Sequence, residues 1–192
     1  QPEKVKVAAS MMLTAPGVSF IYYGEEIGMQ GTAYELVRLP MQWSDGTNAG
    51  FSTAVPWKPV GQGWEIFNVA NENNDPESIL SHFRSLIQVR SENSALRTGN
   101  LSLVATGNPG LYSILRENQE ESILVLVNLT GNPISSYGLS LASSSLVEGM
   151  FSPQLIMGEG TLSPLQVQPG GGFTSYLPLP EIPPYTTVIL KF

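Results

Sequence analysis

The apolar positions first follow a helical period and then gather into a short continuous run. Residues 2–13, PEKVKVAASMML, place apolar side chains three and four positions apart behind an early proline and glutamate, which predicts a helix. The sequence TAPG then ends the helical pattern. The run VSFIYY at 18–23 is aromatic and β-branched between Gly17 and Gly24, which predicts a strand buried on both faces.

Residues 30–75 lack a clear period and are rich in glycine, asparagine and proline. All three tryptophans, Trp43, Trp57 and Trp64, lie in this stretch. A long irregular segment within a compact domain usually carries function. The helical pattern returns at 76–92, where Asp75 predicts an N-cap, followed by a proline in the first helical position.

After about Thr98 the pattern changes to short β-rich runs, which are LSLVAT, GLYSILRE, ESILVLVNLT, LQVQ and TTVILKF. Turn sequences such as GNPG and PGGG separate them, so residues 98–192 are predicted to form an antiparallel β domain of sandwich type. The helix and strand order of residues 1–97 is instead typical of an α/β domain. One strand makes no sheet, so we expect residues 1–97 to be the tail of a larger α/β domain.

Composition excludes several classes of function. The 192 residues carry a net charge of −7 with 13% charged residues, so no basic surface is available for nucleic acid. Cysteine is absent and His82 is the only histidine, which leaves acid–base chemistry to carboxylates and excludes cysteine-ligated and two-histidine metal sites within this chain; no metal-binding residue is assigned. We expect His82 to be an ordinary helix residue. No apolar run reaches the length of a membrane span, and we interpret the N-terminus as a cut end.

Several longer motifs resemble a known family. LTAPGVSFIYYGEEIGM, VRLPMQW, NAGFS, VPWKPV and DPESILSHFRSLIQVRSENSALRTG resemble, in this order, the C-terminal part of the α-amylase family of glycoside hydrolases. The nearest branch contains α-glucosidases, oligo-1,6-glucosidases and trehalose synthases. The resemblance spans about residues 3–99.

The resemblance implies an α/β plus all-β fold. Residues 1–97 would be the last βα segment of a (β/α)8 TIM barrel that is incomplete in this chain, and 98–192 the C-terminal antiparallel β-sandwich. Within the barrel segment, the seventh helix would be 3–14, the eighth strand 18–23 and the eighth helix 76–92, with a long active-site loop between the last two.

The chemistry implied by the resemblance is retaining hydrolysis of α-glucosidic bonds in starch-derived oligosaccharides. The three catalytic carboxylates of the family precede the first residue of this chain, so no catalytic residue is assigned here. We therefore expect the chain alone to be inactive. No cofactor is expected in this chain, although the parent enzyme could bind calcium.

The resemblance also suggests site residues. Glu25 and Glu26 would support the site, and Glu26 aligns best with a recurrent supporting carboxylate. Arg38 would bind substrate, because the family arginine pairs with an aspartate at the bottom of the sugar pocket; the alternative is a surface arginine. Trp43 and Trp57 are candidate sugar contacts, or anchors of the loop.

Other interpretations remain open. One is a transglycosylase or isomerase such as trehalose synthase, and another is a non-catalytic carbohydrate-binding module formed by 98–192. The expected partners are an α-glucan or oligosaccharide, and either the rest of the barrel or a second copy to cover exposed apolar edges.

Overall fold

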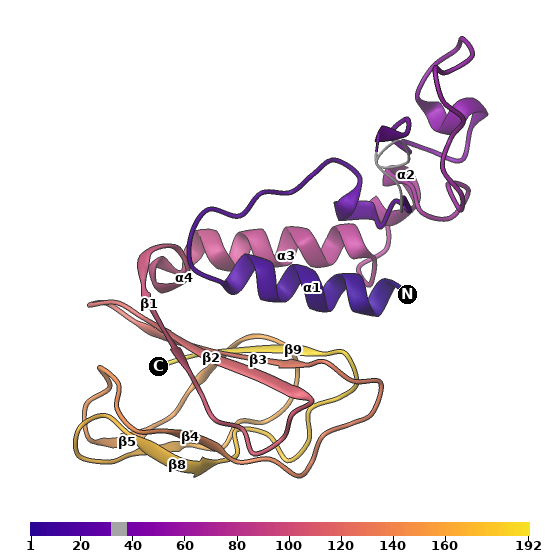
Figure 1. Cartoon of the computed structure of the whole chain (residues 1–192). Coiled ribbons are helices and arrows are strands. Elements are labelled where there is room, and N and C mark those ends of the chain that lie inside the picture. Colours follow the sequence, from indigo (N-terminus) through magenta and orange to yellow (C-terminus); the bar gives the residue numbers. More distant parts are fainter. Residues whose placement is uncertain (32–37) are drawn as a thin grey trace. The chain divides into compact units, whose positions relative to one another are not determined.

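The computed structural model describes residues 1–31 and 38–192 (Figure 1). They divide into two compact units, one formed by residues 1–6 and 19–85 and the other by residues 7–18 and 86–192. The helices are α1 (Pro2–Thr14), η1 (Glu25–Ile27), η3 (Thr47–Gly50), α2 (Val69–Asn73), α3 (Ile79–Glu92) and α4 (Ser94–Thr98). The strands are β1 (Asn100–Leu103), β2 (Leu111–Glu117), β3 (Ser122–Asn128), β4 (Leu139–Leu141), β5 (Gly149–Phe151), β6 (Gln154–Met157), β7 (Leu165–Val167), β8 (Phe173–Tyr176) and β9 (Thr187–Lys191).

The two predicted helices are present, but the second begins later than expected. Helix α3 starts at Ile79 rather than Pro76. Asp75 accepts a hydrogen bond from the backbone of Glu77 (2.8 Å), which forms a turn, and the Ser78 hydroxyl accepts one from the backbone of Ser81 (3.1 Å). Ser78 therefore takes the capping role that the sequence assigned to Asp75.

The strand predicted at 18–23 is absent from the structure, which assigns no strand to these residues. Val18 and Phe20 are 82% and 83% exposed, the opposite of the expected burial. A strand needs a hydrogen-bonded neighbour, and none of the sheets formed by the described residues includes this segment.

The second unit contains the antiparallel β structure that the sequence predicted. One sheet has the order β1-β2-β3-β9-β6, and two further ribbons pair β4 with β8 and β5 with β7. In the central sheet Leu124 lies opposite Leu115 on one side and Leu190 on the other. The five predicted β runs contain β1, β2, β3, β7 and β9, whereas the short strands β4, β5, β6 and β8 were not predicted.

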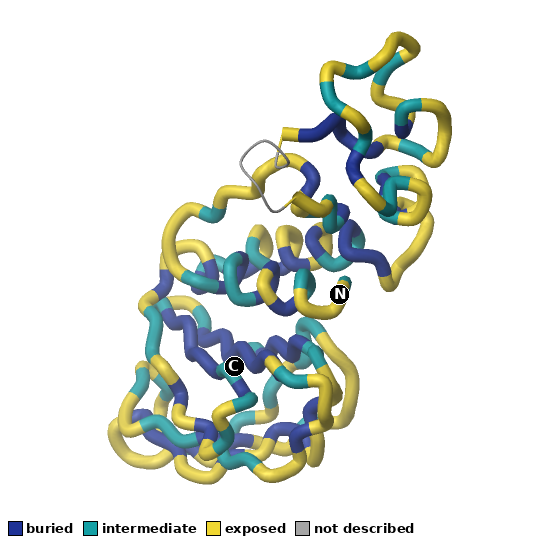
Figure 2. The backbone as a smooth tube through the Cα atoms, turned by 45° about the vertical axis from the view of Figure 1, so that its right-hand side comes forward, coloured by how far each residue is buried: buried dark blue, intermediate teal, exposed yellow. Residues whose placement is uncertain are grey.

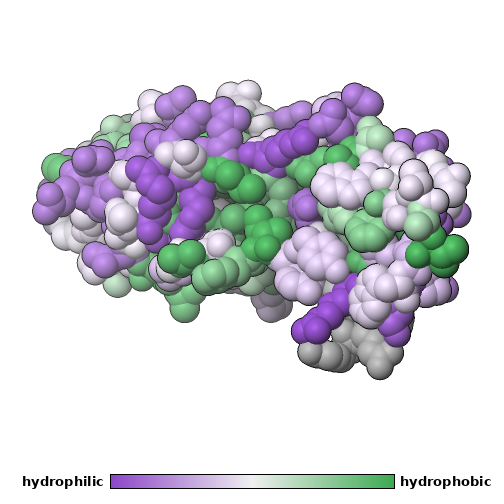
Figure 3. Space-filling model, turned by 90° about the horizontal axis from the view of Figure 1, so that it is seen from above, coloured by the Kyte–Doolittle hydropathy of each residue, from purple (hydrophilic) through white to green (hydrophobic). Residues whose placement is uncertain are grey.

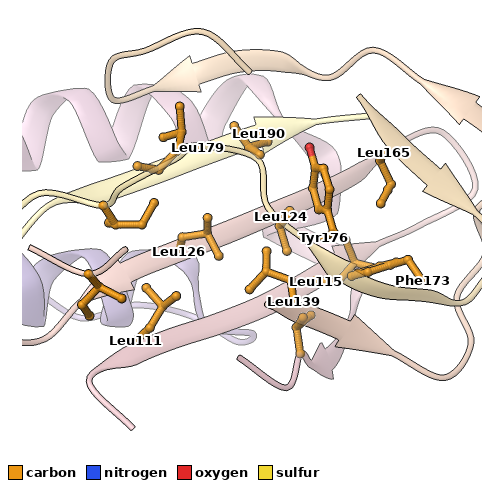
Figure 4. Close-up of a cluster of buried hydrophobic side chains, with 14 of the residues drawn as sticks. Leu111, Leu115, Leu124, Leu126, Leu139, Leu165, Phe173, Tyr176, Leu179 and Leu190 are labelled. Atoms are coloured by element: carbon orange, nitrogen blue, oxygen red, sulfur yellow. The ribbon is translucent and has the colours of Figure 1, made fainter. Parts of the chain in front are cut away.

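A continuous apolar core lies between two layers of strands in this unit. Figure 1 shows β1, β2, β3 and β9 in one layer and β4, β5 and β8 in the other. Every residue of β3 is buried, and the buried positions follow the strands as dark blue segments in Figure 2. Figure 4 shows the side chains of both layers pointing toward one another, among them Leu115, Leu124, Leu139, Phe173 and Tyr176. Such a core supplies most of the stability of a domain.

Two arginines of the second unit bind the C-terminal end of α1. Arg116 on β2 is fully buried and donates to the carbonyls of Thr14 (2.6 Å) and Gly99 (2.8 Å). Arg90 on α3 donates to the carbonyls of Leu13 (2.7 Å) and Ala15 (3.0 Å). The last carbonyls of a helix lack intrahelical partners, so the guanidinium groups satisfy them and complement the helix dipole.

The first unit has a much smaller apolar cluster. Ile27, Met41 and Leu80 are its buried members, with Met29 and Val69 packed against them. The rest of the unit is largely turns and irregular segments. None of the helices in the described ranges is both long and apolar enough to cross a membrane.

Candidate functional site

The first unit contains a pocket of about 360 Å³. It is lined by Tyr23, Glu26, Arg38, Leu39, Pro40, Met41, Trp43, Phe51 and Trp57. Four of these residues are aromatic, and the two that carry full charges have opposite signs. Of the residues selected from the sequence, the structure thus brings together Glu26, Arg38, Trp43 and Trp57.

A tight turn positions Glu26 at the pocket. Gly24 (φ 89°) and Gly28 (φ 65°) flank η1 in left-handed conformations that favour glycine. The Glu26 carboxylate accepts a hydrogen bond from the backbone of Gly24 (2.7 Å), and the backbone of Met29 donates to the Gly24 carbonyl (2.9 Å). Ile27 is fully buried between them and anchors the turn in the apolar cluster.

Glu25 lies differently from its neighbour. Its side chain is exposed and is not among the residues that line the pocket. The Glu25 carboxylate accepts a hydrogen bond from the backbone of Tyr22 (3.2 Å), on the exposed side of the turn. The two adjacent carboxylates therefore do not line one cavity together.

Tyr23 joins the turn to the next pocket segment. Its hydroxyl donates to the carbonyl of Leu39 (3.0 Å), and its ring lies 4.9 Å from that of Tyr22. Burial and the neighbouring Tyr22 raise the pKa of Tyr23, while the charge of Arg38 opposes the shift. Tyr23 thus remains a neutral hydrogen-bond donor at physiological pH.

Arg38 and the aromatic side chains give the pocket its chemical character. Trp43 is 50% exposed, Phe51 44% and Trp57 67%, so their rings remain available at the surface. The Lys58 ammonium lies 5.6 Å from the centre of the Trp57 ring. Exposed aromatic faces beside a guanidinium fork suit a ligand with apolar ring faces and many hydroxyl groups.

Neither Phe51 nor Tyr23 was selected from the sequence, although both line the pocket. The signal that could have identified Phe51 is the motif NAGFS, in which an asparagine and a glycine that are typical of turns precede the phenylalanine. Trp64 is half-buried and is not among the lining residues. Val37, the first residue of VRLPMQW, lies outside the described residues.

Glu72 and His82 of the first unit have shifted pKa values but lie outside the pocket. Glu72 is buried, and burial raises the pKa of its carboxyl although the backbone of Leu80 donates to it (2.9 Å). Burial, assisted by the charge of Lys6, lowers the pKa of His82 to about 4, and the ring lies 3.1 Å from the Lys6 carbonyl. Neither side chain lines the pocket, so both are part of the local packing.

The described part of the chain offers no cluster of three or more histidine, cysteine, aspartate or glutamate side chains that could hold a metal ion.

Comparisons with known proteins agree on one family. The model of the α-amylase catalytic domain matches residues 1–99. An oligo-1,6-glucosidase from Heyndrickxia coagulans is 31% identical over 171 residues, which cover 69% of this chain and 31% of the relative. An α-amylase from Dictyoglomus thermophilum is 34% identical over 131 residues, covering 66% of this chain and 26% of the relative.

Solved structures give the same result. The α-amylase from H. orenii matches with a TM-score of 0.73 and 31% identity, over 100% of this chain and 36% of that protein. The trehalulose synthase from Pseudomonas mesoacidophila matches with a TM-score of 0.74 and 25% identity, over 99% of this chain and 38% of that protein. The chain spans about a third of the length of these relatives. It belongs to the α-amylase family.

Proposed function

We propose that this chain is the C-terminal part of a retaining glycoside hydrolase that acts on α-glucosidic bonds of starch-derived oligosaccharides. The observation that carries the proposal is the pocket that joins Glu26, Arg38, Trp43 and Trp57 within the region matched by the α-amylase family model. A carboxylate, a guanidinium and exposed indole rings are groups that bind sugars by hydrogen bonds and by contact with C–H faces.

Residues 1–97 would complete a (β/α)8 barrel, and 98–192 would form the β-sandwich that follows it. The segment 18–23, which belongs to none of the sheets formed by the described residues, would then become the eighth strand once upstream strands pair with it. The exposure of Val18 and Phe20 supports this proposal, and Figure 3 shows hydrophobic side chains at the surface between hydrophilic ones. Exposed apolar surface of this kind marks a contact with another chain segment or a second copy.

In the complete enzyme each pocket residue would have a distinct task. Arg38 would pair with an upstream aspartate and close the bottom of the sugar pocket, while Trp43 and Trp57 would contact sugar rings. Glu26 would support the loop, because its carboxylate already binds the Gly24 backbone. The nucleophile and the acid/base would come from upstream residues, about 5 Å apart as retention requires, so the 192-residue chain would be inactive. Any calcium would likewise be held upstream.

The test is glucose release from maltose, isomaltose and maltotriose by two proteins. One is the 192-residue chain, and the other is the same chain extended upstream through the proposed barrel, called the extended protein below. We expect turnover only in the extended protein, and the preferred substrate would identify the linkage. Turnover by the 192-residue chain that Glu26→Gln abolishes would overturn the assignment of the catalytic groups.

Transfer of a glucosyl group instead of hydrolysis is the second candidate. It is supported by the similarity to the trehalulose synthase, for which structures in complex with sucrose and with glucose exist. Hydrolysis and transfer both begin with a glycosyl-enzyme intermediate and differ in whether water or a sugar accepts the glycosyl group. Chromatography of the products from maltose would distinguish the two reactions. Hydrolysis yields glucose alone, whereas transfer yields a new disaccharide when glucose is the acceptor, or a trisaccharide and glucose when a second maltose is the acceptor.

A further inference from the structure

The turn before Phe51 has an unusual backbone. Asn48 (φ 53°, ψ 33°), Ala49 (φ 55°, ψ 27°) and Gly50 (φ 69°) form three consecutive left-handed residues. A residue with a Cβ atom is strained in this region, although asparagine tolerates it better than alanine. Such strain persists only where surrounding interactions fix the conformation, and it concentrates at functional sites.

Backbone hydrogen bonds tie this turn to Trp43. The carbonyl of Ala49 accepts from the backbone of Trp43 (2.8 Å) and from that of Ser44 (3.0 Å). Ala49 is fully buried, so this double acceptor is shielded from water. A Cβ atom at Gly50 would lie 2.6 Å from the Ser44 hydroxyl and 3.4 Å from the Trp43 Cβ. The turn therefore lies close against residues 43–44.

The side chain of Asn48 ties the turn to the segment that follows. Its amide nitrogen donates to the carbonyls of Ser52 (2.9 Å) and Ala54 (3.0 Å), which uses both amide hydrogens. The backbone of Phe51 in turn donates to the Asn48 carbonyl (3.0 Å). Asn48 therefore fixes the direction in which the chain leaves the turn, beginning with Phe51.

Trp43 precedes the turn, Phe51 follows it, and both line the pocket. Asn48 is not among the lining residues. We propose that Asn48 is a positioning residue that sets the orientation of the Trp43 and Phe51 rings in the sugar pocket. This inference rests on the proposed function and deepens it, because it identifies what holds the aromatic wall that contacts the sugar.

Two substitutions separate the backbone from the side chain. Asn48→Gly keeps easy access to positive φ but removes the side-chain amide, whereas Asn48→Ala removes the amide and also disfavours positive φ. Asn71→Ala is the matched control, because the Asn71 amide also donates to a loop carbonyl, that of Glu65 (3.0 Å), but holds no segment of the pocket wall. Each variant is made in the extended protein and in the 192-residue chain.

In the extended protein the kinetics of 4-nitrophenyl α-glucoside hydrolysis are measured. We expect KM to rise about fivefold in Asn48→Gly and about tenfold in Asn48→Ala, with kcat within about twofold, because the catalytic carboxylates are untouched. Asn71→Ala should keep the wild-type KM. A fall in melting temperature for the Asn48 variants without a change in KM would reduce the role of Asn48 to stability and overturn the proposal.

The 192-residue chain provides a test that needs no activity. With Trp57→Phe and Trp64→Phe as background, Trp43 is the only tryptophan, and acrylamide quenching reports its accessibility. We expect quenching to change in both Asn48 variants and to stay constant in Asn71→Ala; unchanged quenching in all three would contradict the inference. If the wild-type extended protein hydrolyses no glucoside, the proposed function fails, and this measurement still decides the role of Asn48.

Discussion

The β strands of the second unit and residues 38–57 of the first unit, called the pocket segment below, use apolar residues in opposite ways. Every residue of β3 is buried, and its leucines and valines contact both neighbouring strands. In the pocket segment Trp43 and Trp57 keep half or more of their surface exposed. Burial stabilises a fold, whereas an exposed ring contributes little until a ligand covers it. We infer that stability is concentrated in the β core and binding in the irregular segment.

Truncation of a core leucine tests this division most strongly. Leu124 is fully buried in the middle of the five-stranded sheet, and we expect Leu124→Ala to lower the free energy of unfolding by about 3 kcal/mol through lost burial and a new cavity. Urea denaturation followed by circular dichroism measures the change. Leu103→Ala is the control, because Leu103 is largely exposed on β1. Equal losses in the two variants would mean that the β core does not dominate stability.

Removal of the buried guanidinium should have the next largest effect. Arg116→Met keeps the length of the side chain but leaves the carbonyls of Thr14 and Gly99 without their donor, which we expect to cost about 2 kcal/mol. Arg97→Met, at an exposed position on α4, is the matched control. The same urea titrations compare them. A stabilised Arg116→Met would show that desolvation of the guanidinium outweighs its hydrogen bonds.

The sequence predicted elements that show a clear local pattern and failed where the structure depends on distant residues. β3 was predicted because ESILVLVNLT contains the continuous apolar run ILVLV at 123–127, with polar residues on both sides. The three-residue strands β4 and β5 were missed, whereas β7, which has the same length, was predicted from LQVQ. The run at 18–23 has the composition of a strand, but a strand also needs a neighbour, which no local pattern reveals.

The candidate site was predictable only in part, for a related reason. Motifs identified Arg38, Trp43 and Trp57, which the structure places on one pocket, whereas Phe51 was missed. Phe51 reaches the pocket through a left-handed turn that includes Ala49, a residue type that gives no signal for positive φ. The roles of these residues in sugar binding remain predictions.

A pH titration extends the comparison to the first unit. The pKa of His82 in the folded chain is about 4, so below its ordinary value of 6.5 the unfolded chain binds a proton that the folded chain does not. The stability due to neutral His82 is therefore complete above pH 6.5 and falls progressively toward pH 4. We expect His82→Gln to remove this acid sensitivity, which the two pKa values put at about 2 kcal/mol between pH 7 and about pH 4.5.

Urea titrations at pH 7.0 and about pH 4.5 for both proteins isolate the contribution of His82. The difference in unfolding free energy between wild type and variant is the relevant quantity, because protonation of Glu72 changes stability in the opposite direction. Burial raises the pKa of Glu72, so its protonation favours the folded chain as the pH falls. Identical pH profiles for wild type and His82→Gln would show that the imidazole is solvated in the folded state.

The smallest effect on stability is expected at the pocket, where stability and sugar binding can be measured separately. Trp57 is 67% exposed, so Trp57→Ala should change the free energy of unfolding by less than about 0.5 kcal/mol. In the extended protein the same substitution should raise KM for maltotriose about tenfold, since an aromatic face that covers a sugar ring contributes about 1 kcal/mol or more. Loss of stability comparable to that of Leu124→Ala would instead make Trp57 an anchor of the loop. A neutral substitution by both measures would remove it from the sugar site, because an indole ring that neither packs nor binds has no role in the pocket.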